Sequence, residues 1–358
     1  MSDFSKTMND ILNYGALNLA MGIGYKNEIF DILEDLGKPV TIAQIAFASN
    51  LNERYLKEWL GIMVTGKIIE LSHTKDGVDQ YYLPPEHASF LTRKSGSNNL
   101  GVYTQEIPLL TSCAMDSVNK GFKTGGGIPF SQYPDFQQFM TELSNAKHNE
   151  VLIQYFLPSV DKGKLVERLK SGISVCDLGC GQGVALHLMA KAFPESTFTG
   201  IDNHSKAINT AGAKAKQMGL LNVICVELDA AAICEKEEFM QKFDYVCAFD
   251  SIHDQSHPLK TLKSIRYMLA PGGMFSMVDI KASSNLADNM AHPMGAFLYT
   301  VSLMHCMPIG LNDNGTGLGM MWGREKAEKL LAEAGFEYIE VCEMENDSFN
   351  LHYLCKVA

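Results

Sequence analysis

The sequence predicts a two-part chain, with a mainly helical N-terminal part and an α/β C-terminal part built on a parallel sheet. Three observations support this. Apolar residues recur at helical spacing through residues 14–67. From residue 173 onward, strand-like and helix-like segments alternate, as in parallel sheets covered by helices. The first of these strands is followed by the glycine-rich turn of residues 179–183, which is typical of a nucleotide-binding turn.

Composition limits the classes of function. A chain of 358 residues is long for one domain, and its 46% apolar and 20% charged content is that of a globular protein. A net charge of −11 disfavours nucleic acid or an anionic membrane as the main partner. No apolar stretch has membrane-spanning length, and the start lacks a signal-peptide pattern, so we expect a cytoplasmic protein. Nine scattered cysteines without a CxxC pair predict reduced thiols and no metal site.

The N-terminal elements predict a winged-helix domain over residues 1–95. A helix spans residues 14–36 and ends at Gly37-Lys38-Pro39. Thr41 caps a second short helix, and Asn52 opens a third that extends to residue 67. Two strand-like segments, residues 68–72 and 81–84, flank a turn-rich stretch and form the wing.

Winged helices often bind DNA, but the charge of this one predicts otherwise. Residues 1–95 contain nine Lys/Arg and twelve Asp/Glu. A net negative module lacks the basic surface that phosphate contacts require. We therefore expect a dimerisation or scaffold role, with DNA binding as the alternative.

Residues 96–170 read as a helical linker and substrate-lid region. They are broken at residues 122–136 by a loop rich in glycine, proline and aromatic residues. Long structured loops often cover sites, although a plain surface connector has the same sequence signals.

The α/β part contains five predicted strands, at residues 173–179, 197–202, 222–229, 243–250 and 273–280. Ligands bind parallel sheets of this kind beyond the carboxyl ends of the strands, where the strand order reverses. Four acidic residues lie at such ends and are the candidate ligand-binding side chains: Asp177, Asp202, Asp229 and Asp250.

Residues 173–280 resemble class I S-adenosylmethionine-dependent methyltransferases. Four motifs occur in order: DLGCGQG at residues 177–183, GID at 200–202, LDA at 228–230 and LAPGG at 269–273. A dinucleotide-binding turn places its third glycine one position later, to pack beneath a pyrophosphate. The resemblance implies a Rossmann-like, seven-stranded methyltransferase domain over residues 171–358 that binds S-adenosylmethionine.

The resemblance also implies roles for individual residues. Asp177 would hold the methionine ammonium group, and Asp202 with the following Asn203 would meet the ribose hydroxyls. Asp229 and the Ala230 backbone would lie by the adenine amine, and Asp250 beside the sulfonium. The backbone of three glycines would approach the methionine and ribose portions closely: Gly179, Gly181 and Gly183.

The candidate catalytic residues are His253 and Asp254, directly after the fourth strand. They resemble the histidine–aspartate pair of plant-type small-molecule O-methyltransferases, in which the histidine is the general base. Those enzymes also carry an N-terminal winged-helix dimerisation domain. Gln255 stands where that group usually has tryptophan, which leaves the substrate class open. A purely structural loop histidine is the alternative.

The stretch of residues 285–323 is inserted before the last helix and is dense in methionine, aromatics and glycine. In the family such an insertion forms the acceptor-side wall. With residues 122–136, it resembles the bacterial-type winged-helix methyltransferases of unassigned substrate. Tyr299, Ser302 and His305 fall one helical turn apart and are candidate substrate contacts, together with Tyr133 and Trp322. Plain core packing would give the same composition.

The sequence therefore predicts a cytoplasmic, homodimeric S-adenosylmethionine-dependent methyltransferase that acts on an O or S atom of a small molecule. The alternatives are N-methylation of a small molecule, an S-adenosylmethionine-sensing transcriptional regulator, and a catalytically silent partner protein.

Overall fold

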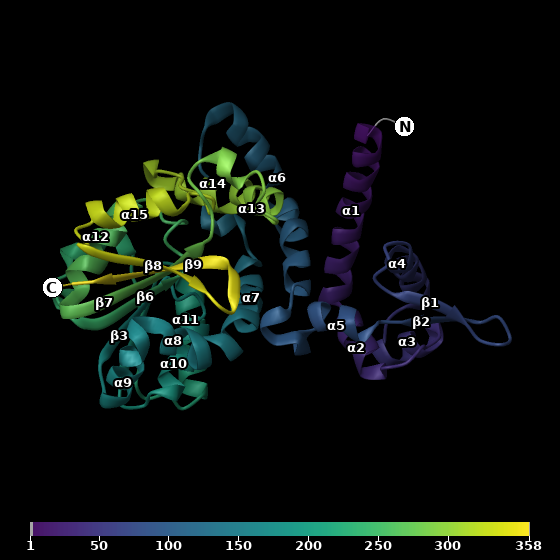
Figure 1. Cartoon of the computed structure of the whole chain (residues 1–358), viewed down its shortest axis with the longest axis horizontal. Helices are drawn as coiled ribbons and strands as arrows, with labels where there is room; N and C mark the ends of the chain where they lie inside the picture. Colours follow the sequence, from purple (N-terminus) through teal and green to yellow (C-terminus); the bar gives the residue numbers. More distant parts are fainter. Residues whose placement is uncertain (1–2, 358) are drawn as a thin grey trace. The chain divides into compact units, whose positions relative to one another are not determined.

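The computed structural model describes residues 3–357 and divides into two compact units, Met1–Leu109 and Leu110–Ala358 (Figure 1). The boundary lies within helix α6 (Glu106–Thr124), beyond the end of the expected winged-helix domain at residue 95. Each unit has a core of its own and is described separately. Among residues 3–357, every helix is too short or too polar to traverse a bilayer.

The N-terminal unit has the predicted order of helices followed by a two-stranded wing. Thr41 forms a capping box with Gln44, and the Asn52 side chain accepts from the Arg54 backbone N–H, so both predicted caps are present. The aromatic side chains of Tyr25 and Phe30 are fully buried in this unit. Its elements are α1 (Asp3–Lys26), α2 (Ile29–Leu36), α3 (Ile42–Ser49), α4 (Glu53–Thr65), β1 (Glu70–His73), β2 (Asp79–Tyr82) and α5 (Pro85–Leu91).

The single helix predicted for residues 14–36 is wrong. The chain forms α1 and α2, which are separated at Asn27 and Glu28, and Glu28 adopts a left-handed conformation with φ 58°. Apolar spacing continues on both sides of this break, because both helices bury their faces in the same core. The periodicity alone therefore hides the break.

The C-terminal unit contains a seven-stranded sheet with the order β5-β4-β3-β6-β7-β9-β8. All neighbouring pairs from β5 to β7 are parallel, and β9 runs antiparallel to both β7 and β8. The strand order reverses between β3 and β6, which makes this the expected ligand-binding point. The strands are β3 (Ser174–Leu178), β4 (Thr197–Asp202), β5 (Val223–Glu227), β6 (Phe243–Phe249), β7 (Leu269–Ile280), β8 (Tyr338–Met344) and β9 (Asp347–Lys356).

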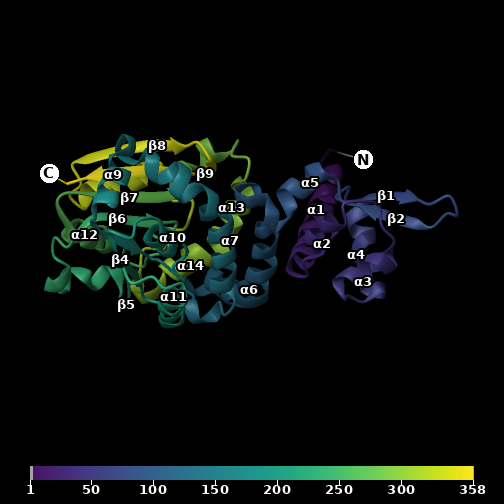
Figure 2. The ribbon, with the colours of Figure 1, turned by 90° about the horizontal axis from the view of Figure 1, so that it is seen from below.

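Helices cover both faces of this sheet (Figure 2). Alternate residues of β6 enter opposite cores: Val246 and Ala248 pack with α12 and α15, while Tyr245 and Cys247 pack with α9 and α10. Burial on both faces explains why the central strands read as continuous apolar runs. The helices are α7 (Phe136–Val151), α8 (Leu157–Ser159), α9 (Lys164–Ser171), α10 (Val184–Ala192), α11 (Ser205–Gln217), α12 (Pro258–Met268), α13 (Gly295–Val301), α14 (Met307–Gly310) and α15 (Arg324–Glu333).

The LAPGG turn expected before the fifth parallel strand is incorporated into β7. Pairing with β6 shifts register between Phe243 and Tyr245, and Gly272 within the turn has φ +73°. This irregularity lets the chain leave α12 and enter the sheet without a separate loop.

Candidate active site

A cavity of about 570 Å³ opens at the carboxyl ends of β3, β4 and β6, where the strand order reverses. This volume is in the range of small-molecule and cofactor sites. The predicted acids Asp177, Asp202, Asp229 and Asp250 all line it, as does Asn203. Parallel strands bring these residues together from positions far apart in the sequence.

The glycine turn uses its three glycines differently. Gly179 and Gly181 line the cavity with φ +72° and +53°, a backbone region that favours glycine. A Cβ on Gly179 would lie 2.6 Å from Ser251 Cβ, whereas at Gly181 the nearest atom is Gln137 Oε1 at 3.5 Å. Gly183 is not among the described lining residues. A Cβ there would meet the His187 ring at 2.8 Å, so this glycine allows the turn to enter α10.

Asp202 is fixed by the glycine turn itself. Its Oδ2 accepts from Gly181 N at 2.8 Å, and its Oδ1 accepts from His204 N at 2.8 Å. Burial raises the pKa of this carboxyl, and the two backbone hydrogen bonds oppose the rise. Each carboxylate oxygen keeps acceptor capacity, which suits a ligand with vicinal hydroxyls.

Asp177 is the most buried acid at the cavity, with 2% of its surface exposed. Burial raises its pKa to about 7, and the nearby Asp202 adds to the rise. The Cys247 thiol is a weak donor to it, at 3.8 Å. A buried carboxylate without a counter-charge favours a cationic ligand, so the site fits an ammonium group.

The two residues expected beside the adenine, Asp229 and Ala230, differ in their position relative to the cavity. Asp229 lines the cavity, and its side chain accepts from Ala231 N at 2.9 Å. Ala230 is buried and is not among the described lining residues, whereas Ala231 is. The backbone contact expected at residue 230 therefore remains a prediction.

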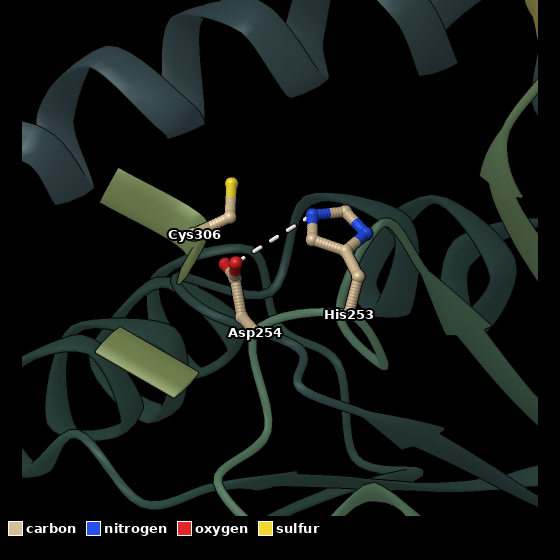
Figure 3. A group of neighbouring side chains, drawn as sticks. All are labelled: His253, Asp254 and Cys306. Carbon is tan, nitrogen blue, oxygen red and sulfur yellow. Dashed lines mark ion pairs between the residues drawn. The ribbon is translucent and has the colours of Figure 1, made fainter. Parts of the chain in front are cut away.

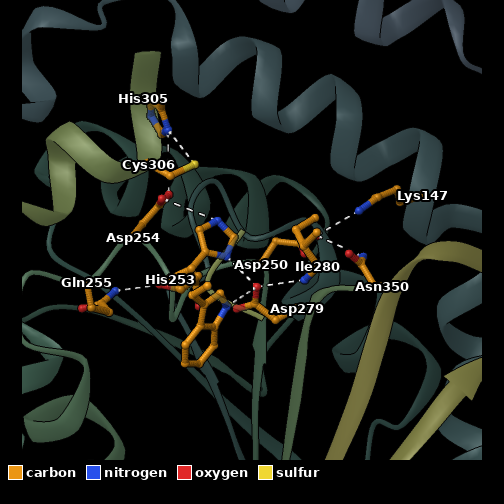
Figure 4. A network of polar contacts seen from close by, with 12 residues as sticks. Lys147, Asp250, His253, Asp254, Gln255, Asp279, Ile280, His305, Cys306 and Asn350 are labelled. Atoms are coloured by element: carbon orange, nitrogen blue, oxygen red, sulfur yellow. Dashed lines mark hydrogen bonds and ion pairs between the residues drawn. The ribbon is translucent and has the colours of Figure 1, made fainter. Parts of the chain in front are cut away.

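Asp250 follows β6 in a left-handed conformation, with φ 48°. Its Oδ2 pairs with Lys147 Nζ at 2.9 Å and accepts from Asn350 Nδ2 at 3.4 Å (Figure 4). Its Oδ1 is buried without a hydrogen-bond partner among the described residues. A strained backbone with an unsatisfied oxygen at a cavity wall is typical of a ligand contact.

Helix α7 supplies a wall of the cavity and belongs to the segment expected to be a helical linker and substrate-lid region. Its lining residues recur every three or four positions in two adjacent rows and thus share one helix face: Phe136, Gln137, Met140, Thr141, Leu143, Ser144, Lys147 and His148. The spacing was present in the sequence. Because most of these side chains are polar, the sequence gave no sign that this face borders a cavity rather than solvent.

His253 lies behind the cavity wall, with 2% of its surface exposed, between two carboxylates (Figure 4). Its Nδ1 contacts Asp279 Oδ1 at 2.7 Å, and its Nε2 lies 3.5 Å from Asp254 Oδ1. Burial lowers the pKa of the imidazole, but Asp279 and Asp254 outweigh burial and leave the pKa well above its usual value. Asp254 lines the cavity and His253 does not, so Asp254 is the member of the pair nearest to an acceptor.

Asp279 was missed by the sequence interpretation. It ends β7 and is 1% exposed, and its Oδ1 also accepts from Trp322 Nε1 at 3.0 Å and from Ile280 N at 2.8 Å. Asp279 lies near the end of a strand, and this position is the signal that identified Asp177 and Asp202 in the sequence. The local sequence VDI at residues 278–280, however, matches none of the four methyltransferase motifs.

The five residues predicted to contact the substrate do not line the cavity. Tyr133 donates to Met304 O at 2.8 Å, Tyr299 OH accepts from Asn289 Nδ2 at 3.0 Å, and the His305 ring stacks on Phe136 at 3.7 Å. None of the five is among the described residues that line the cavity: Tyr133, Tyr299, Ser302, His305 and Trp322.

The predicted shared face of Tyr299, Ser302 and His305 does not bring them into one contact region. Helix α13 ends at Val301, and residues Ser302–Cys306 form a π-helical turn. A π-helical turn holds more residues than an α-helical one, so a spacing of three no longer aligns side chains. Tyr299 packs in a separate cluster with Ile280 and Leu298.

The loop within residues 122–136 contributes to the cavity wall through Pro129 and Phe130. Ile128 N donates to Pro308 O at 3.0 Å, and Asn312 Nδ2 donates to Ile128 O at 2.5 Å. The Phe130 ring contacts both His204 and His305, at 5.1 and 6.0 Å between centroids. This loop thus forms part of the cavity wall, and its role as a substrate lid remains a prediction.

Residues 169–341 match the family described as a methyltransferase domain. This part of the chain therefore carries a methyltransferase domain. Residues 15–93 match the Rv2258c-like winged helix-turn-helix domain. The two matches agree with the order of the predicted domains.

Curated relatives match only part of this chain. The ribosomal RNA small subunit methyltransferase G of Porphyromonas gingivalis is 27% identical over 125 residues, 35% of this chain and 52% of the relative. The same enzyme of Parabacteroides distasonis is 39% identical over 153 residues, 43% and 63% of the two chains. The tRNA (guanine-N(7)-)-methyltransferase of Hydrogenovibrio crunogenus is 28% identical over 112 residues, 29% and 47%. The chain thus spans about half the length of the first of these relatives.

Solved structures match the fold over nearly the whole chain. Human N-acetylserotonin methyltransferase, in complex with S-adenosylmethionine, superposes with a TM-score of 0.71 at 16% identity, covering 100% of this chain and 99% of that one. A Nostoc punctiforme protein described as a candidate O-methyltransferase gives a TM-score of 0.72 at 17% identity, with 99% of both chains covered. At such identities the likeness shows the shared fold, a winged helix followed by a Rossmann-like methyltransferase domain.

Proposed function

We propose that this chain transfers a methyl group from S-adenosylmethionine to an O or S atom of a small-molecule acceptor. The observation that carries the proposal is one cavity that joins the glycine turn and its acids to the carboxylate of Asp254, with His253 directly behind it. S-adenosylmethionine, when bound, supplies a methyl group on an electron-deficient sulfonium that an aligned nucleophile displaces.

The cofactor side of the cavity would be divided among the acids at the strand ends. Asp177 would bind the ammonium group and Asp202 the ribose hydroxyls, with Asn203 beside it. Asp229 would lie at the adenine end, and Asp250 Oδ1 would face the methionine portion. The backbones of Gly179 and Gly181 would allow the ligand to approach, because neither presents a side chain there.

His253 is the candidate general base, with Asp254 and Asp279 as its partners. Asp279 holds Nδ1, so Nε2 is turned toward Asp254 at the cavity wall. A proton leaving a hydroxyl or thiol acceptor would be received by the Asp254–His253 pair in the state in which the imidazole is neutral. The raised pKa of His253 makes the neutral imidazole a stronger base and moves its appearance to higher pH. Asp279 would keep the imidazole in the orientation that directs Nε2 outward.

Charge at the cavity supports a small acceptor rather than a nucleic acid. The described lining residues include one lysine, Lys147, which is paired with Asp250, and six aspartates: Asp177, Asp202, Asp229, Asp250, Asp254 and Asp313. Such a surface repels a polyanion. The curated relatives named for rRNA and tRNA match only about a third of this chain, whereas the full-length structural matches include small-molecule methyltransferases such as the mitomycin 7-O-methyltransferase.

We further propose a cytoplasmic homodimer formed through the N-terminal unit, as the sequence predicts. Helix α1 exposes large apolar side chains, among them Phe4 at 69%, Ile11 at 54% and Leu12 at 67%. A row of this kind on one helix suits a second copy of the chain better than water. All nine cysteines are free thiols, which agrees with a reducing compartment.

The winged helix-turn-helix match keeps an S-adenosylmethionine-sensing regulator as a second candidate function. In α4, however, Arg54 forms an ion pair with Glu58. This pairing reduces the positive charge available for DNA phosphates. A gel shift with genomic fragments that weakens with salt would favour this candidate over the enzyme.

The proposal is tested with radiolabelled S-adenosylmethionine and a fractionated small-metabolite extract. The wild type is compared with Asp177→Ala and His253→Ala, and S-adenosylhomocysteine binding is measured for each by calorimetry. We expect label in one fraction, lost in both variants, with cofactor binding lost only in Asp177→Ala. Label retained by His253→Ala would remove the base role and point to an acceptor that ionises unaided. No label with any fraction, despite cofactor binding, would contradict the proposed function.

A further inference from the structure

Three side chains with metal-binding atoms meet next to the acceptor end of the cavity (Figure 3). The side-chain donors of His253, Asp254 and Cys306 lie within 4.8 Å of one another, and His253 and Cys306 are buried. We propose that this His–Asp–Cys cluster binds one divalent transition-metal ion, Zn²⁺ or a similar cation. The ion would keep one coordination position open for the acceptor's oxygen or sulfur.

The donor set selects the type of metal. One imidazole nitrogen, one carboxylate oxygen and one thiolate sulfur form a mixed set that suits Zn²⁺ and neighbouring transition metals. Mg²⁺ and Ca²⁺ prefer oxygen ligands and more of them than this cluster offers. Three protein ligands with a fourth position open are the arrangement of catalytic zinc sites.

The distances already approach those of a tetrahedral site. Zinc bonds of roughly 2.0–2.3 Å place neighbouring ligand atoms about 3.3–3.8 Å apart. His253 Nε2 and Asp254 Oδ1 are 3.5 Å apart. The Cys306 sulfur, within 4.8 Å of both, has to approach by about 1 Å at most to complete the site.

The surroundings orient the ligands as metal sites require. His253 Nδ1 is bound to Asp279 Oδ1 at 2.7 Å, and Trp322 Nε1 holds the same oxygen at 3.0 Å. A histidine whose Nδ1–H is fixed by a carboxylate presents its Nε2 lone pair to a metal, a pairing common to metal-ligating histidines. Asp254 Oδ1, the atom facing Nε2, is buried without a hydrogen-bond partner among the described residues.

Metal binding would exchange protons for the ion. The thiol proton of Cys306, and the Nε2 proton of His253 where it is present, leave to solvent as the ion enters past Asp254, the cavity-lining ligand. An acceptor thiol or hydroxyl in the open position would then lose its proton to solvent water on coordination, because the ion stabilises the anion. In this state His253 acts as a ligand, and its base role is confined to the metal-free chain.

The inference rests on the proposed function and narrows its acceptor class to molecules with a thiol or hydroxyl that coordinates the ion. Neutral amines coordinate too, but they do not need to lose a proton before methyl transfer. Among the two acceptor atoms proposed above, sulfur is favoured when the ion is zinc, since zinc binds thiolates strongly.

The test uses Co²⁺ as a spectroscopic substitute for zinc in the full-length chain. We expect the wild type to bind one equivalent, with visible bands of tetrahedral cobalt and a near-ultraviolet thiolate-to-cobalt band. Cys306→Ser should lose the thiolate band and bind at least tenfold more weakly, and Asp254→Asn should weaken binding similarly. The matched control is Cys342→Ser in β8, which should behave as the wild type. Wild type that retains no cobalt, or Cys306→Ser with an unchanged spectrum, would overturn the inference.

S-adenosylhomocysteine binding, measured on the same samples, separates this inference from the proposed function. None of the three cluster residues contributes to the predicted cofactor contacts, so binding should persist in every variant and report an intact fold. If the wild type does not bind S-adenosylhomocysteine, the proposed function is contradicted, whether or not the chain binds cobalt. Intact cofactor binding without cobalt binding would contradict the metal site alone.

Discussion

Replacing Asp177 with asparagine should make the protein more stable and a weaker cofactor binder. The carboxyl is 2% exposed, and burial raises its pKa from 3.8 to about 7. Between these two pH values the folded state binds the proton that the unfolded state has released. The contribution of Asp177 to stability is therefore favourable at low pH and is lost as pH rises toward 7.

The size of this effect follows from the pKa difference. About 3 pKa units at 1.36 kcal/mol each give a cost of about 4 kcal/mol for the ionised carboxylate above pH 7. Asparagine has nearly the same shape and never ionises, so Asp177→Asn should gain up to this amount at pH 8 and little at pH 4. Removing the charge also removes the partner proposed for the methionine ammonium group, which should weaken S-adenosylhomocysteine binding by about 10- to 100-fold.

Urea unfolding between pH 4 and 8.5, followed by tryptophan fluorescence, measures the stability difference, because Trp322 lies in the same unit. The control is Glu195→Gln, which replaces an exposed carboxylate and should leave stability unchanged. Equal or lower stability of Asp177→Asn at pH 8 would refute the burial argument. Unchanged affinity for S-adenosylhomocysteine, measured by calorimetry, would instead refute the assigned cofactor contact.

Three further predictions concern the cavity-wall loop, the histidine support and the N-terminal helix. Gly127→Ala places a Cβ 2.7 Å from Asn312 N, so the loop at residues 122–136 should detach and be cleaved faster by protease. In the control Gly126→Ala the nearest atom to the new Cβ is 3.7 Å away, so the cleavage rate should not change. Trp322→Phe removes the indole N–H that donates to Asp279. We expect kcat to fall about tenfold while the affinity for S-adenosylhomocysteine stays unchanged. An equal loss of kcat and of this affinity would indicate misfolding instead. Ile11→Glu should shift the chain from dimer to monomer in sedimentation experiments, and an unchanged mass would place the interface elsewhere.

The glycines and acids that line the cavity were predictable because the signals that identify them are local. Asp177 is separated from Gly179 and Gly181 by only a few residues, and Asp202 ends the next strand. The parallel strand order then brings all of them to one edge of the sheet. Gly183 shows the limit of the motif: it belongs to the same turn, but its missing side chain leaves room for the His187 ring in the first turn of α10.

The acceptor side was not predictable to the same depth, because its determinants are packing interactions. The side chain of Asp279 contacts His253, which lies 26 positions earlier in the sequence. Nothing in the sequence near either residue predicts this contact. The face of α7 that borders the cavity has the same polar composition as a solvent-exposed face. Tyr299 and His305 have helical spacing, but the π-helical turn at Ser302–Cys306 separates them.

By itself, the sequence determined the fold class, the order of the two domains, and the glycine turn and strand-end acids that line the cavity. These features depend on residues close in the chain or on the general geometry of parallel sheets. Only the tertiary structure decided that His253 lies behind Asp254 with Asp279 on its other nitrogen, and that Cys306 from the inserted segment reaches the same pair. Residues so distant in sequence meet because the 285–323 insertion packs against the end of β7, and no local pattern encodes that meeting.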